Sequence, residues 1–188
     1  MRILYINAAF REDSRTAKLA EHYLQLCKGE IKRLNLGEDY PAPLDAARLA
    51  IYNQSVAAHD FSHQMFDTAK EFVQADEIVI AAPFWNYSIP AALHAYLEMV
   101  CSQGVSFDID EKGVYHSLCR AKKLTFIMTS GGFIPEKNHA FGYIEDLVEV
   151  FWKIPEVHYY KAEGVDVYGT DVEALLAAVC AQMDEEEA

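Results

Sequence analysis

Short apolar runs alternate along the chain with stretches in which apolar side chains recur every three or four residues. The runs predict buried strands, because a parallel strand covered on both faces is apolar almost throughout, and the recurring pattern predicts amphipathic helices. Strands are expected at residues 3–7, 31–36, 77–82, 123–129 and 157–162. Helices are expected at residues 16–28, 61–74, 90–101, 143–153 and 171–183.

Three segments depart from this alternation. Residues 37–57 have a loop-like composition around Pro41 and Pro43, with a short helix expected at 45–52. Residues 104–115 predict a small hairpin with a turn near Gly113. Residues 184–187 read Asp-Glu-Glu-Glu, and we expect them to form a solvated, frayed tail.

Strands that alternate with helices predict an α/β fold, in which a doubly wound five-stranded parallel sheet carries helices on both faces. Right-handed crossovers leave few strand orders, and the flavodoxin-like order 2-1-3-4-5 is the commonest at this length. No linker or repeat interrupts the pattern, so residues 1–188 are expected to form a single domain. Such sheets bind ligands at the carboxyl ends of their strands, near the switch between strands one and three, which nominates loops 7–16, 82–90 and 129–135.

Composition narrows the classes of partner. Lys and Arg number 16 against 29 Asp and Glu, and this net charge of -13 argues against nucleic acid or an anionic membrane as partner. No apolar run approaches the roughly 20 residues of a membrane helix, and no targeting segment is seen, so a cytoplasmic location is expected. The cysteines and histidines lack metal-ligand spacing, so no metal is expected, and His59 and His63 are expected on a solvated helix face.

The first nominated loop ends at an expected helix N-terminus with Ser14, Arg15 and Thr16. It lacks the glycine spacing of a dinucleotide fingerprint or a P-loop. Free N–H groups, two hydroxyls and a guanidinium can surround a phosphate there, and the helix dipole favours the anion. Capping of the helix by Ser14 alone is the alternative.

The second loop contains Pro83, Phe84, Trp85, Asn86 and Tyr87 and closes with a second proline. Aromatic faces and backbone donors held by proline suit a large planar heteroaromatic ligand. Core packing is the alternative for the aromatic side chains, although the Asn86 amide then needs hydrogen-bond partners.

The third loop reads Thr129, Ser130, Gly131 and Gly132. Paired glycines allow a ligand to approach the backbone closely, while the hydroxyls add polar contacts. An ordinary turn is the alternative. Together, the three loops predict a flat cofactor with a phosphate tail.

The string from Pro83 to Leu93 resembles that of the FMN-dependent NADH:quinone oxidoreductases, or azoreductases, of flavodoxin-like fold, and the resemblance covers nearly the whole chain. It implies that FMN is held by three groups of residues. These are Ser14, Arg15 and Thr16 at the phosphate, Pro83, Phe84, Trp85, Asn86 and Tyr87 around the isoalloxazine edge, and Thr129, Ser130, Gly131 and Gly132 beside the ring. The segment from Gly104 to Phe107 resembles the start of a family hairpin, which implies that Phe107 lines the substrate side.

The resemblance also implies an activity. Hydride passes from NADH or NADPH to the flavin, and a quinone, azo or nitro compound is reduced in a second step, with no side chain required as acid or base. Backbone N–H groups of residues 84–87 and of Gly131 and Gly132 are expected to stabilise reduced flavin. The family's homodimer implies an active site near an interface formed by helices 89–101 and 143–153.

Some positions depart from the family pattern. Ser130 stands where Arg is usual, Ala8 and Ala9 where a Ser is usual, and Phe84-Trp85 replaces a Met-Tyr pair. Two alternatives therefore stay open beside the enzyme: a non-enzymatic flavodoxin-type electron carrier, and a flavin-free scaffold of the same fold.

Overall fold

A parallel five-stranded sheet organises the computed structural model, which describes residues 1–38 and 42–188. Its strand order is β2-β1-β3-β6-β7, which confirms the predicted order 2-1-3-4-5. The interior strands are buried along almost their whole length, as continuous apolar runs require. The strands are β1 (Arg2–Asn7), β2 (Glu30–Asn35), β3 (Glu77–Pro83), β6 (Lys123–Ser130) and β7 (Glu156–Glu163).

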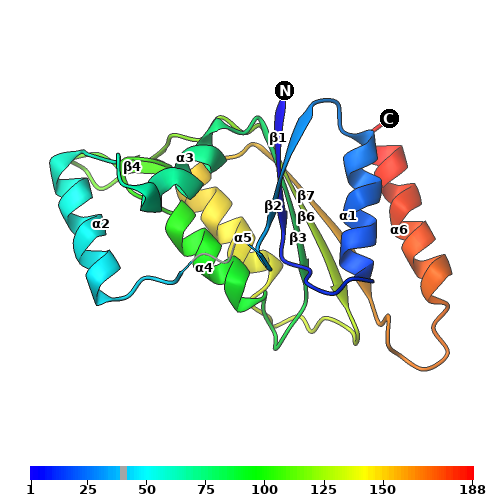
Figure 1. Cartoon of the computed structure of the whole chain (residues 1–188). Helices are drawn as coiled ribbons and strands as arrows, with labels where there is room; N and C mark the ends of the chain where they lie inside the picture. The colour runs from blue at the N-terminus through cyan, green and yellow to red at the C-terminus, as the bar shows by residue number, and fades with distance from the viewer. Residues whose placement is uncertain (39–41) are drawn as a thin grey trace.

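Helices cover both faces of the sheet (Figure 1). One face carries α1 (Arg15–Leu26) and α6 (Val172–Glu186). The other carries α3 (Asp67–Gln74), α4 (Ala91–Val100) and α5 (Phe141–Leu147), which continues as the π-helical turn η2 (Val148–Trp152). Alternate side chains of each strand enter the two cores: Ile78 and Ile80 pack on the α4 side, and Val79 packs on the α1 side. In the described part of the chain, no helix is long and apolar enough to cross a membrane.

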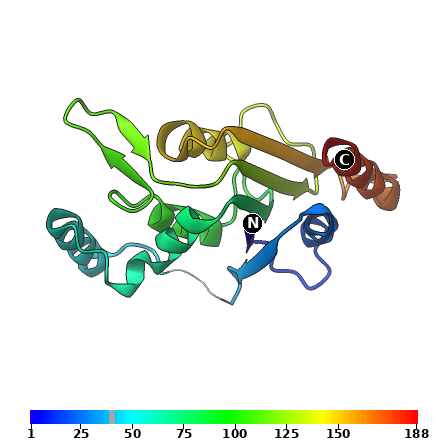
Figure 2. The ribbon, with the colours of Figure 1, turned by 90° about the horizontal axis from the view of Figure 1, so that it is seen from above.

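Helix α2 (Ala46–Ala58) and the hairpin of β4 (Phe107–Ile109) and β5 (Tyr115–Ser117) lie at the end of the molecule away from α1 and α6 (Figure 2). The hairpin confirms the prediction. The helix begins where expected, with Asp45 as its N-cap, but runs six residues further than the predicted end at 52, because no glycine or proline interrupts residues 46–58. Pro41 of the predicted loop lies outside the described residues.

The predicted helix at 61–74 was wrong at its start. The helical segment begins with the 3-10 turn η1 (Gln64–Phe66), where the His63 ring accepts a hydrogen bond from the Met65 N–H at 3.2 Å. His59 ends α2 in the left-handed conformation with φ of 50°, so it does not share a helix face with His63 as predicted. Phe61 instead packs edge-to-face on Phe66, with ring centroids 5.2 Å apart.

The tail at 184–187 is not frayed as predicted, although residues 184–186 are exposed as expected. Helix α6 extends to Glu186, whose carboxylate accepts a hydrogen bond from the Tyr160 hydroxyl at 2.8 Å. Glu187 pairs with Lys123, and His158 lies 3.7 Å from the same carboxylate. An acidic run is expected to be solvated, but here Lys123 of β6 and the Tyr160 hydroxyl of β7 bind two of its carboxylates.

Candidate functional site

A cavity of about 400 Å³ opens at the carboxyl edge of the sheet, the edge that lies at the bottom of Figure 1. Loops that follow β1, β3, β6 and β7 all contribute to its wall. The predicted residues that line it are Ser14, Arg15, Thr16, Pro83, Phe84, Trp85, Thr129 and Gly131. The structure therefore brings the three nominated loops to one place, as the switch-point rule predicts.

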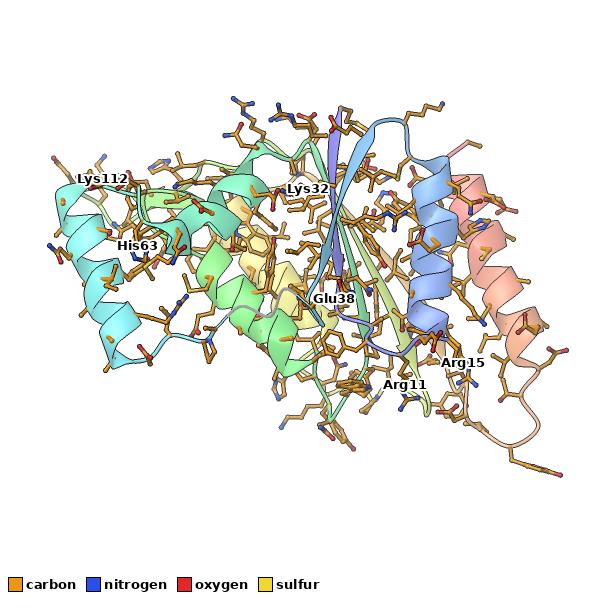
Figure 3. The ribbon with its side chains drawn as sticks, viewed as in Figure 1. Arg11, Arg15, Lys32, Glu38, His63 and Lys112 are labelled. Carbon is orange, nitrogen blue, oxygen red and sulfur yellow. The ribbon has the colours of Figure 1, made fainter. Side chains whose placement is uncertain are left out.

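The first loop places three polar side chains at the start of α1. The Ser14 Oγ accepts a hydrogen bond from the Ala17 N–H at 3.2 Å, so this residue does cap the helix. Thr16 is buried, and its hydroxyl lies 2.6 Å from the Thr129 hydroxyl, which joins the first and third loops. Arg15 donates from Nη1 to the Asp166 Oδ1 at 2.6 Å. Arg15 and Arg11 lie together at this end of the molecule (Figure 3).

The second loop forms a two-residue turn. Trp85 and Ser88 exchange N–H···O bonds of 2.9 Å in both directions, and Asn86 and Tyr87 between them have φ of 50° and 65°. Positive φ at both central positions is the type I′ arrangement, which is costly for a Tyr. The turn leaves Trp85 39% and Tyr87 60% exposed, so core packing explains Phe84 but not these two rings.

Neighbouring segments hold this turn in place. The His139 N–H donates to the Tyr87 carbonyl at 2.8 Å, and the Ser88 hydroxyl donates to the His139 carbonyl at 2.8 Å. The His94 Nε2 lies 3.0 Å from the same hydroxyl. Because that hydroxyl already donates, the geometry fits a neutral His94 that donates from Nε2, and burial lowers the pKa of His94 in the same direction.

The backbone of the second loop retains fewer donors than predicted. The Phe84 N–H donates to the Thr129 carbonyl at 2.9 Å, and the Trp85 N–H donates to Ser88. Within residues 84–87, the donors that these bonds leave for a ligand are the N–H groups of Asn86 and Tyr87.

The third loop is fixed through its carbonyl groups. Gly164, Val165 and Asp166 donate their N–H groups to the carbonyl oxygens of residues 132, 130 and 131 at 2.9, 3.1 and 2.9 Å. In a trans peptide the N–H lies opposite the C=O, so the N–H groups of residues 131–133 point away from the loop after β7. A Cβ added at Gly132 would meet nothing within 4 Å, whereas Ser130 is buried away from the cavity.

Sequence reasoning missed the loop after β7. Val165 and Asp166 line the cavity, as do Phe10, Arg11 and Asp13 of the first loop. The switch-point rule does not nominate the loop after the outer strand β7. However, β6 and β7 are in register up to Ser130 and Glu163, so the loops that follow them must meet. The predicted strand order, which places the fourth and fifth strands side by side, could therefore have pointed to the loop after β7.

Phe107 lies apart from the other predicted site residues. It is buried in the hairpin, with its ring centroid 4.6 Å from that of Phe151 and 5.7 Å from that of Tyr115. Asn86, Tyr87 and Gly132 adjoin the cavity-lining residues along the chain without lining the wall themselves.

Fold and site together define an α/β protein with a crevice at the sheet's switch point. The sequence matches the family described as flavodoxin-like fold over residues 1–186, and the chain belongs to that family.

The "FMN-dependent NADH:quinone oxidoreductase 2" of Clostridium acetobutylicum is 32% identical, with 93% of this chain and 92% of that protein covered. A protein of Coprothermobacter proteolyticus named "FMN-dependent NADH:quinone oxidoreductase" is 29% identical, over 92% of this chain and 90% of that protein.

A solved structure shares the fold. The FMN-dependent NADH-azoreductase from Bacillus anthracis, a complex with FMN, superposes with a TM-score of 0.82 at 20% identity, covering 99% of this chain and 97% of that one. This likeness confirms the flavodoxin-like architecture.

Proposed function

We propose that this protein is an FMN-dependent NADH oxidoreductase that reduces quinones, and azo or nitro compounds of similar flat shape. The observation that carries the proposal is the cavity at the carboxyl edge, which has a helix N-terminus at one end and exposed aromatic side chains at the other. The names of the relatives agree with it.

The donor set of the cavity fits FMN. The first turn of α1 and the Arg15 guanidinium suit a phosphate, while Phe84 and Trp85 offer apolar faces to a planar ring. The N–H groups of Gly131 and Gly132 suit the acceptors of a pyrimidine edge, and the open space at Gly132 allows a ring to approach. Ala8 is buried outside the cavity wall, whereas Ala9 lines the wall, so an Ala in place of a Ser at Ala9 removes one hydroxyl from the cavity while the first turn of α1 and Arg15 stay in place.

FMN, when bound, supplies the two-electron redox chemistry between NADH and the acceptor. The chain's own residues would bind this cofactor and orient it. Asn86 and Tyr87 offer backbone N–H groups held by a turn that His139 fixes, so these donors need no rearrangement when negative charge develops near them. No protein acid or base is required in this proposal, because solvent can protonate the product.

A homodimer is part of the proposal. A groove of about 760 Å³ lies between α2, α4 and α5, and its wall includes Leu44, Tyr52 and Phe151. Leu49 and Ile51 of α2 are exposed beside it. A second copy of the chain would cover these apolar side chains. Of the helices concerned, α4 and α5 are the two that the resemblance implies, and α2 is added by the structure. Sedimentation of the purified protein at two times the monomer mass is the expected result.

We further propose that residues 1–188 act as one domain in the cytoplasm. The family match spans residues 1–186, which supports one domain. All four cysteines are free thiols, as in a reducing compartment.

Purified protein reconstituted with FMN should oxidise NADH continuously when a quinone is present. Protein that binds FMN but shows no turnover with NADH and quinone would instead be an electron carrier. Protein that cannot be reconstituted with FMN would be a flavin-free scaffold and would end the proposal. The amplitude of flavin absorbance and the NADH oxidation rate, measured on one preparation, separate the three outcomes.

A further inference from the structure

The side chains of Arg15 and Asp166 pair at the end of the cavity where α1 begins. The Nη1 of Arg15 lies 2.6 Å from the Oδ1 of Asp166, and both residues line the cavity. Arg15 opens α1, whereas Asp166 lies in the loop between β7 and α6, so the contact joins segments 151 positions apart in the sequence. Figure 3 shows Arg15 at the base of α1, where this loop passes.

Backbone contacts determine where the Asp166 carboxylate lies. The Asp166 N–H donates to the Gly131 carbonyl at 2.9 Å. A Cβ added at Gly131 would lie only 2.5 Å from the Asp166 Oδ2, so the carboxylate rests directly on the glycine. The absence of a side chain at Gly131 therefore gives Asp166 its place opposite Arg15.

Because of this arrangement, Arg15 at the phosphate end of the cavity is already paired with Asp166 before a ligand binds. Ser14 is used as the helix cap, and the Thr16 hydroxyl is shared with Thr129. Two cationic side chains, Arg11 and Arg15, line the cavity; Arg15 opens α1, and Asp166 balances its charge. A phosphate dianion that binds at the start of α1 must approach Arg15 against the negative charge of Asp166.

We propose that Asp166 competes with the flavin phosphate for Arg15 and thereby weakens the affinity of this site for FMN. The inference rests on the proposed function, since it takes FMN as the ligand. Binding of the phosphate moves the Arg15 guanidinium from the carboxylate to the phosphate. Riboflavin has the same ring but no phosphate, so its affinity is independent of Asp166.

The test compares FMN and riboflavin affinities, measured by quenching of flavin fluorescence at low ionic strength. Asp166→Asn should bind FMN about five- to tenfold more tightly than the unmodified protein, whereas riboflavin affinity should change less than twofold. Asp13→Asn is the matched control, because Asp13 also lines the cavity but Arg15 pairs with Asp166. Its gain for FMN should be smaller, and 0.5 M salt should reduce both gains by screening.

A double-mutant cycle tests whether the effect of Asp166 on FMN affinity depends on Arg15. Arg15→Gln should weaken FMN binding about tenfold, and adding Asp166→Asn to that variant should then give little further gain. An Asp166→Asn protein that binds FMN no better, or less tightly, than the unmodified chain would overturn the competition while leaving the FMN proposal intact. Failure of every variant to bind either flavin would overturn both.

Discussion

The two ends of the same sheet differ in how their polar groups and aromatic rings are used. At the amino end, the Tyr23 hydroxyl donates to Glu77 and accepts from Thr125, both at 2.8 Å. Lys123 extends this cluster by pairing with Glu187. At the carboxyl end, Trp85 and Tyr87 are exposed and a left-handed turn carries a tyrosine. The amino-end cluster satisfies its own groups and contributes stability, while the carboxyl end leaves groups available to a ligand.

The largest expected effect comes from breaking the amino-end cluster. Tyr23→Phe removes the hydroxyl that donates to Glu77, whose side chain is buried, and leaves that carboxylate without this donor. We expect the free energy of unfolding to fall by about 2 kcal/mol, measured by urea denaturation.

FMN affinity of Tyr23→Phe should change less than twofold, because the cluster lies at the opposite end of the sheet. Tyr168→Phe is the matched control, since Tyr168 is fully exposed and its hydroxyl should not affect stability. A large fall in flavin affinity in folded Tyr23→Phe protein would contradict the division between the two ends.

At the carboxyl end, Gly132→Leu should lower the affinity for FMN and leave the stability of the fold nearly unchanged. Open space around an added Cβ means that the folded protein accommodates the side chain, so the unfolding midpoint should change little. The leucine would occupy the space of the flavin ring, and we expect FMN affinity to fall at least about tenfold, which corresponds to about 1.4 kcal/mol.

Gly142→Leu serves as the control for Gly132→Leu, because a Cβ there also meets nothing within 4 Å but the residue lies in α5, away from the cavity. Equal FMN affinity in both variants would show that the third loop does not bind the ring.

A smaller effect is expected from His94, which links the carboxyl-end turn to α4. Burial lowers the pKa of His94 in the folded state below its ordinary value of 6.5, so the unfolded chain takes up a proton first as the pH falls. The contribution of His94 to stability is therefore neutral above about pH 7 and becomes unfavourable as the pH falls through 6.5 toward the folded pKa.

His94→Gln keeps a donor for Ser88 but cannot titrate. Its urea midpoint should fall less between pH 7.5 and pH 5.5 than that of the unmodified chain. If the two proteins lose stability equally over this range, groups other than His94 determine the acid sensitivity.

The sequence predicted the sheet well because buried parallel strands appear as apolar runs, and few strand orders suit five of them. It predicted α2 poorly, since a helix with no buried residue has no apolar face to recognise. It missed the bound tail because the partners of Glu186 and Glu187 come from distant strands. Ser14, Thr16 and Thr129 were found through loop position, whereas Asp166 carries no motif and depends on the pairing of β6 with β7.

Helix α2 has a consequence for hydrogen exchange. The Tyr52 hydroxyl accepts from the Gln103 N–H at 3.0 Å and its ring packs on Phe66, but no residue of the helix is buried. The helix can therefore open without disturbing the sheet, so its amides should exchange with deuterium far sooner than those of β3. A second copy that covers the neighbouring groove would slow that exchange, which makes the α2 amides a built-in reporter of assembly.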